Sequence, residues 1–73
     1  MLVTIEYCVQ WSSYDKAAGL AARLEKEFSA KTELIESSGG AFEVVVDGDL
    51  FFSKKQTGER PDEDLIVAKI ANR

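Results

Sequence analysis

The fold is decided by residues 2–13, which read LVTIEYCVQWSS. Apolar and polar side chains alternate over residues 2–7, and this alternation predicts a strand with one well-buried face. Ser12 or Ser13 can cap the helix that follows. The only cysteine, Cys8, therefore lies where a strand gives way to a helix. Backbone N–H groups and the positive end of a helix dipole make such a position suitable for a thiolate.

The pattern of a helix follows directly from this stretch. Apolar residues recur at spacings of three and four and form one stripe: Ala17, Leu20, Ala21, Leu24 and Phe28. A short strand is expected from Lys31 to Glu36. The next residues, Ser37-Ser38-Gly39-Gly40, are the clearest loop in the sequence.

The second half of the chain reads as a hairpin and a helix. Residues 42–47 alternate as a strand, Asp47-Gly48 is a strong signal for a two-residue turn, and residues 49–53 return. Lys54 to Arg60 is polar and reads as a loop. A helix is then expected from Pro61, with Asp62, Glu63 and Asp64 at the positive end of its dipole.

The expected order is β-α-β-β-β-α in a single domain spanning residues 1–73. A right-handed β-α-β crossover makes the first two strands parallel, and the hairpin adds two antiparallel strands. The simplest compact solution is an α/β two-layer sandwich. It has a four-stranded mixed sheet with both helices on one face, which is the minimal thioredoxin-like arrangement.

The turn at Asp47-Gly48 also predicts which side chains share a face. Continuous pairing sets Val45 opposite Leu50, Val44 opposite Phe51 and Glu43 opposite Phe52. Val45, Leu50 and Phe52 would then lie, together with Glu43, on the sheet face without helices. We expect this apolar patch to bind a protein partner or a second copy of the chain.

Composition narrows the class of function. The net charge is −4 and there is no histidine. No basic stripe is present to neutralise phosphates, so a nucleic-acid partner is not expected. The commonest metal ligand and general base is missing, so neither a metal site nor a cofactor is expected. No stretch reads as a signal peptide or a membrane span, and a lone cysteine suits a reducing compartment, so we expect a cytoplasmic protein.

Several of these segments together resemble the selenoprotein W-like (Rdx) family of thioredoxin-like proteins. The resemblance spans nearly the whole chain. Its motifs are Ile5-Glu6-Tyr7-Cys8, then Gly39-Gly40-Ala41-Phe42-Glu43-Val44, and finally Asp47-Gly48 leading through Leu50 to Ser53-Lys54-Lys55. The resemblance implies a role in thiol redox homeostasis.

The chain departs from the family at one position that matters for this role. The family motif is Cys-x-x-Cys or Cys-x-x-selenocysteine, and Cys8 matches its first position. The second position is Trp11, which has neither a thiol nor a selenol. Either Trp11 is the native residue of a member that has lost dithiol chemistry, or it stands at a codon one base away from cysteine or selenocysteine.

Two functions remain open. In the first, Cys8 acts as a monothiol that forms mixed disulfides with glutathione as a co-substrate, at most a weak oxidoreductase. The loop residues near it would be Val9, Gln10, Ser12, Ser13, Gly39 and Gly40. In the second, the protein is a redox-inactive interaction module that uses the Cys8–Trp11 loop and the open sheet face. Cys8 is then a packing residue, and Trp11 is either a loop aromatic or an interface anchor.

Overall fold

A computed structural model describes residues 1–9 and 13–73 of the chain. The expected elements are present, together with one additional short helix. Their bounds are β1 Leu2–Cys8, α1 Ser13–Phe28, β2 Lys31–Ser37, β3 Phe42–Val46, β4 Asp49–Ser53, α2 Lys54–Thr57 and α3 Glu63–Ala71.

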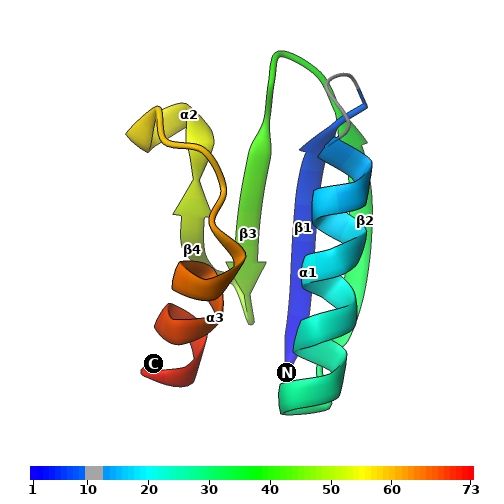
Figure 1. Cartoon of the computed structure of the whole chain (residues 1–73), viewed down its shortest axis with the longest axis vertical. Coiled ribbons are helices and arrows are strands. Elements are labelled where there is room, and N and C mark those ends of the chain that lie inside the picture. The colour runs from blue at the N-terminus through cyan, green and yellow to red at the C-terminus, as the bar shows by residue number, and fades with distance from the viewer. Residues whose placement is uncertain (10–12) are drawn as a thin grey trace.

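The four strands form one mixed sheet in the order β2-β1-β3-β4. β1 is parallel to β2 and antiparallel to β3, and β3 is antiparallel to β4. Helices α1 and α3 both cover the same face of the sheet (Figure 1). The thioredoxin-like two-layer sandwich expected from the sequence is therefore confirmed. In this arrangement the end of β1, the start of α1 and helix α2 lie at the same end of the sheet (Figure 1).

The core lies between the sheet and the two longer helices. The strands contribute alternate residues, as expected for strands with one buried face. Each large apolar side chain that is fully buried stabilises the fold by about 1.5–3 kcal/mol. The core cluster contains Val3, Ile5, Tyr7, Phe42, Val44, Val46 and Phe52 from the sheet, Ala17, Leu20, Ala21 and Leu24 from α1, Ala30 from the α1–β2 connection, and Ile66, Val67 and Ile70 from α3.

The β3–β4 hairpin corrects the expected pairing. Val45 does lie opposite Leu50, but a β-bulge follows, so that Val44 lies opposite Phe52 rather than Phe51. One extra residue in a strand turns the following side chains to the other face. Phe52 is consequently 8% exposed and packs edge-to-face on Phe42, with ring centroids 6.2 Å apart. The prediction that Phe52 lies on the open face is wrong.

Helix α2 replaces the first part of the loop expected over residues 54–60. Its N-cap is Ser53, whose hydroxyl accepts a hydrogen bond from the Gln56 N–H at 3.2 Å. Its C-cap is Gly58, which has a positive φ of 71° and donates its N–H to the Lys54 carbonyl. Serine followed three residues later by glutamine is a helix-start pattern, and glycine is a common helix end. These two caps make a stable single turn out of a polar stretch.

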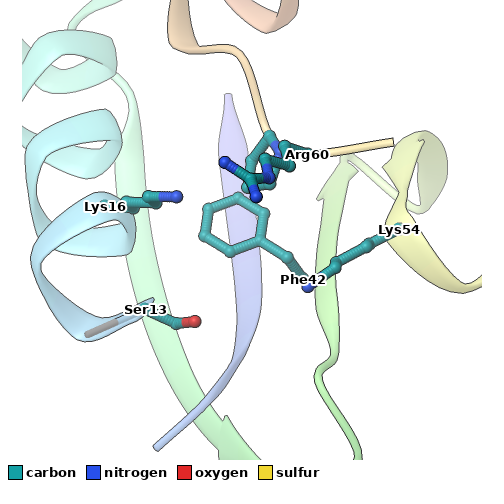
Figure 2. A pocket seen from close by; sticks show the side chains of 6 residues that line it. Ser13, Lys16, Phe42, Lys54 and Arg60 are labelled. Atoms are coloured by element: carbon teal, nitrogen blue, oxygen red, sulfur yellow. The ribbon is translucent and has the colours of Figure 1, made fainter. Parts of the chain in front are cut away.

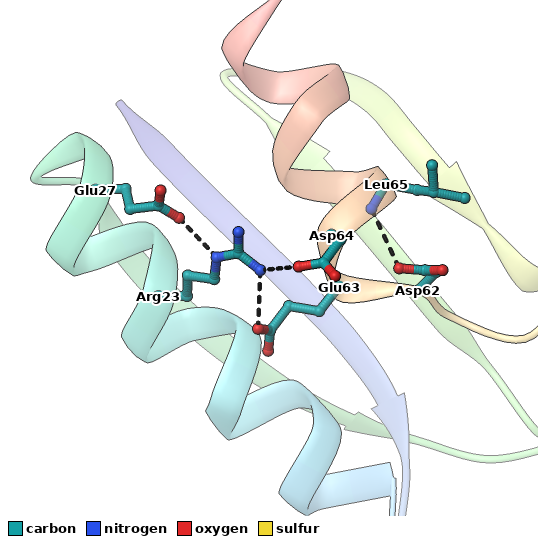
Figure 3. Close-up of polar contacts among 6 residues, drawn as sticks. All are labelled: Arg23, Glu27, Asp62, Glu63, Asp64 and Leu65. Atoms are coloured by element: carbon teal, nitrogen blue, oxygen red, sulfur yellow. Dashed lines mark hydrogen bonds and ion pairs between the residues drawn. The ribbon is translucent and has the colours of Figure 1, made fainter.

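Helix α3 begins two residues later than expected. Asp62, not the residue before Pro61, is its N-cap, and its carboxylate accepts a hydrogen bond from the Leu65 N–H (Figure 3). An aspartate side chain that satisfies a free N–H of the first turn defines a helix start better than proline does. Pro61 therefore lies just outside the helix.

Arg23 of α1 joins the two long helices. Its guanidinium donates to Glu27 at 2.7 Å, to Glu63 at 3.2 Å and to Asp64 (Figure 3). Hydrogen bonds from Asp64, then Glu27 and Glu63, raise the pKa of Arg23 above its usual range. Two of the three acidic residues at the start of α3 thus bind a cation on α1, in addition to the dipole role expected for them.

The turn at Asp47-Gly48 has positive φ angles of 49° and 90°, as a type I′ hairpin requires. The Asp47 carboxylate also contacts residues near both ends of the chain. Its carboxylate accepts the Leu2 N–H at 2.8 Å and pairs with Arg73 at 3.0 Å. The hydrogen bond from the Leu2 N–H, followed by the one from Arg73, holds the pKa of this carboxyl below its ordinary value.

We expect these contacts to make stability depend on pH at the acid end. Because the pKa of Asp47 is lowered in the folded state, its contribution is present above the unfolded pKa of about 3.9 and is lost as the pH falls through the folded pKa. Asp47→Asn keeps an acceptor oxygen and tolerates positive φ but carries no charge. The melting temperature of the wild type should exceed that of Asp47→Asn at pH 7, and the gap should close on acidification. A gap that is the same at every pH would contradict this role.

Candidate functional site

Cys8 is the last residue of β1 and lies at the sheet end where α1 begins (Figure 1). Its backbone N–H donates to the Ala41 carbonyl at 2.8 Å, and Ser37 of β2 lies beside it in register. Only 1% of Cys8 is exposed, whereas the next residue, Val9, is 56% exposed. The thiol is therefore at the position that the sequence predicts but is covered in this conformation.

The rest of the motif falls largely outside the described part of the chain. Gln10, Trp11 and Ser12 lie outside the described residues, and this includes the second motif position. Ser13 is the first residue of α1 and is half-buried. The roles expected for Trp11 remain predictions.

The start of α1 is held against β1 by two tyrosines. Tyr7 and Tyr14 pack edge-to-face, with ring centroids 5.7 Å apart and an interplanar angle of 63°. Tyr7 is buried, and desolvation, followed by the charge of Glu36 and the neighbouring Tyr14, raises the pKa of its phenol. The pair fixes the helix that follows the cysteine relative to the strand that carries it.

The Gly39-Gly40 connection delivers β3 to Cys8, as the sequence predicts. Both glycines have positive φ, 71° and 74°, which residues with a Cβ adopt only rarely. The next residue, Ala41, is the one whose carbonyl binds the Cys8 N–H. Phe42 then starts β3 with its ring in the core. The two glycines thus shape the backbone beside the thiol.

A cavity of about 280 Å³ opens at this end of the molecule. Figure 2 shows Ser13, Lys16, Lys54 and Arg60 arranged around the Phe42 ring. Among the residues that the structure describes, the lining is Ser13, Lys16, Phe42, Lys54, Arg60 and Pro61. Sequence reasoning missed this cavity because its lining comes from α1, β3, α2 and the α2–α3 connection. No single stretch of sequence carries a sign of it.

The open sheet face is less apolar than expected. Leu50 is 46% exposed and Val45 is half-buried, but Phe52 is in the core. Glu6 and Glu43 lie opposite one another on β1 and β3. Their alternation with Ile5 and Val44, which face the core, places them on the open face. Glu43 was expected on this face and Glu6 lies beside it, so the apolar area is smaller than predicted because Phe52 is missing from it.

The length and hydropathy of the helices bear on whether any of them could cross a membrane. In the described parts of the chain, no helix has both the length and the apolar character that crossing a bilayer requires.

Comparison with known proteins supports one family. The model of the Rdx family matches residues 2–72. A selenoprotein W-related protein from Vibrio cholerae superposes with a TM-score of 0.83 at 25% identity, covering 97% of this chain and 92% of that one. A protein from Bordetella parapertussis superposes with a TM-score of 0.86 at 22% identity, covering 97% and 94%. No curated protein matches the chain.

Proposed function

Because this chain belongs to the Rdx family of thioredoxin-like proteins, we propose that it is a monothiol redox protein. Cys8 is its redox-active group and forms mixed disulfides with a small thiol of the glutathione type. The observation that carries this proposal is the position of Cys8 at the end of β1, where α1 begins. It is also the only thiol in the sequence, so an internal disulfide is excluded.

The proposed reaction is a thiol–disulfide exchange. The Cys8 thiolate attacks one sulfur of glutathione disulfide, whose S–S bond breaks as the Cys8–glutathione bond forms. The second glutathione leaves as a thiolate and takes up a proton from water. The thiolate of another thiol compound then attacks the glutathione sulfur of the adduct and forms its own mixed disulfide with glutathione, which regenerates the Cys8 thiolate, so the net reaction passes one glutathione from glutathione disulfide to that thiol. A reducing cytoplasm suits this cycle, because glutathione is abundant there.

The burial of Cys8 determines the kinetics that we expect. Only 1% of Cys8 is exposed, so neighbouring groups must move away from its sulfur before this sulfur can attack a disulfide along the S–S axis. The reaction in the folded protein should therefore be slower than that of a free cysteine. It should nevertheless proceed under conditions where the domain stays folded.

The test is incubation of the folded protein with glutathione disulfide, followed by mass detection. The wild type should gain one glutathione and lose it on reduction, whereas Cys8→Ser should gain none. Serine is close to cysteine in size, so Cys8→Ser should keep the fold, which circular dichroism checks. A wild type that gains no adduct until it is denatured would refute the proposal.

The near-complete burial of Cys8 favours a second candidate function, a redox-inactive interaction module. Its contact surface would be the open sheet face with Val45 and Leu50, joined to the loop that follows Cys8. Leu50→Asp should then abolish self-association or partner binding, and Cys8→Ser should leave it unchanged. Sedimentation of both variants against the wild type separates this candidate from the first.

A further inference from the structure

The cavity lined by Phe42 and Pro61 is unusual in its charge. The chain has 13 acidic and 9 basic residues, yet of the described residues that line the cavity three are basic and none is acidic. Figure 2 shows the charged ends of Lys16 and Arg60 close to the Phe42 ring, with the hydroxyl of Ser13 on the same side. One third of the basic residues of this acidic protein therefore line a single cavity.

Within residues 1–9 and 13–73, Lys16, Lys54 and Arg60 form no salt bridge, whereas Arg23 and Arg73 do. Like charges around one cavity repel each other, and an anion bound between them removes that repulsion. Arginine and lysine are the residues that proteins use to bind carboxylates and phosphates.

The backbone positions of several residues that line the cavity are fixed by secondary structure and hydrogen bonds. Lys54 is the first residue of α2, and the Glu43 carboxylate accepts both its N–H at 3.0 Å and the Ser53 hydroxyl at 2.6 Å. Ser13 and Lys16 are fixed on the first turn of α1. Phe42 is 2% exposed and belongs to the core. The ammonium groups of Lys16 and Lys54 therefore project from helices, whereas Arg60 lies in the connection between α2 and α3.

The cavity adjoins the backbone that holds Cys8. A Cβ placed on Gly40 would lie 3.9 Å from the Lys54 Nζ, so this ammonium reaches to the Gly39-Gly40 connection. The next residue, Ala41, accepts the Cys8 N–H, and Phe42 after it lines the cavity. Residues 40–42 therefore contact both β1, which carries the thiol, and the cavity with its cationic side chains.

We propose that this cavity binds the carboxylates of an anionic peptide thiol, with glutathione as its representative. The proposal rests on the function proposed above for Cys8. Cationic side chains on three separate segments suit two separated carboxylates. A compact phosphate is more often held by clustered backbone N–H groups. The half-buried Pro61 gives the carbon chain between the carboxylates an apolar surface to pack on.

The first test uses a ligand that cannot react. S-methylglutathione is titrated into the Cys8→Ser variant and followed by backbone amide NMR. Shifts should centre on residues 13–16, 54 and 60. The double variant Lys16→Gln/Arg60→Gln should bind about tenfold more weakly or worse, since charge-assisted hydrogen bonds are lost. The matched control is Lys31→Gln, which changes an exposed cation on β2 that is not in the lining and should bind as before.

Two results of this titration would overturn the proposal. One is an absence of shifts around the cavity, or an equal loss of affinity in Lys31→Gln. The other is that inorganic phosphate shifts these residues while S-methylglutathione does not, which would make the cavity a phosphate site. Because Cys8 is absent from this experiment, its outcome does not depend on whether the thiol reacts.

The second test links the cavity to the thiol. In the protein with Cys8 intact, the rates of adduct formation are measured with glutathione disulfide and with the uncharged 2-hydroxyethyl disulfide. The ratio of the two rates should fall by about tenfold in Lys16→Gln/Arg60→Gln and stay unchanged in Lys31→Gln. An unchanged ratio in the double variant means that the cavity does not guide the thiol and the proposal is wrong. Reaction with neither disulfide would instead refute the proposed function of Cys8.

Discussion

Phe52→Asp is expected to unfold most of the protein at room temperature. Phe52 is 8% exposed and packs on Phe42 beneath α3. Removing a buried phenylalanine side chain costs about 3–5 kcal/mol, and burying an unpaired carboxylate adds to that. A domain of this size has about 5 kcal/mol of stability to lose. Circular dichroism and a thermal scan measure the result directly.

The matched control is Leu50→Asp, two residues earlier on the same strand. Leu50 is 46% exposed and lies opposite Val45 on the open face. The variant should remain folded, with a change in the free energy of unfolding of about 1 kcal/mol or less. A folded Phe52→Asp would contradict the β-bulge, because without it Phe52 would point away from the core.

The second large effect is expected at Glu43, whose carboxylate holds the start of α2. It accepts the Ser53 hydroxyl at 2.6 Å and the Lys54 N–H at 3.0 Å. Ser53 is only 4% exposed, so its hydroxyl cannot readily turn to water. Hydrogen bonds to a charged group contribute about 1.5–3 kcal/mol. We expect Glu43→Ala to lower the free energy of unfolding by about 2–3 kcal/mol in urea titrations.

Two further variants separate the hydrogen bonds from the charge. Glu43→Gln keeps one acceptor oxygen and should lose roughly half as much stability as Glu43→Ala. Glu33→Ala removes an exposed carboxylate from β2, which should change stability by about 0.5 kcal/mol or less. If Glu43→Ala were as stable as Glu33→Ala, the contacts to Ser53 and Lys54 would not be holding α2.

The order of the elements follows from the sequence because local signals agree with each other. Alternation over residues 2–7, the stripe from Ala17 to Leu24 and the turn at Asp47-Gly48 each predict an element that the structure contains. The β-bulge was not predictable in this way. Phe51 and Phe52 are adjacent and both apolar, so the sequence does not decide between them; in the structure Phe52 is buried against Phe42, and Phe51 packs partly buried against the core.

The features of the candidate site were likewise predictable where they depend on local sequence and not where they depend on tertiary packing. The place of Cys8 at a strand end is a local property and was predicted, as was the approach of Gly39-Gly40 to it. The extent of its burial was not predictable, because that depends on chain segments far apart in the sequence. Helix α2 could have been found from Ser53 and Gln56 followed by Gly58, a short capping pattern inside a polar stretch.

The central claim, that Cys8 is a working monothiol, is tested most directly by following glutathione adduct formation at Cys8 while the fold is monitored in the same sample. If the claim is right, the adduct forms at a concentration of glutathione disulfide that leaves the circular dichroism spectrum unchanged, and a reductant reverses it. If the adduct appears only in step with unfolding, Cys8 is a packing residue. The redox function would then be wrong, and the open sheet face would be the surface to study.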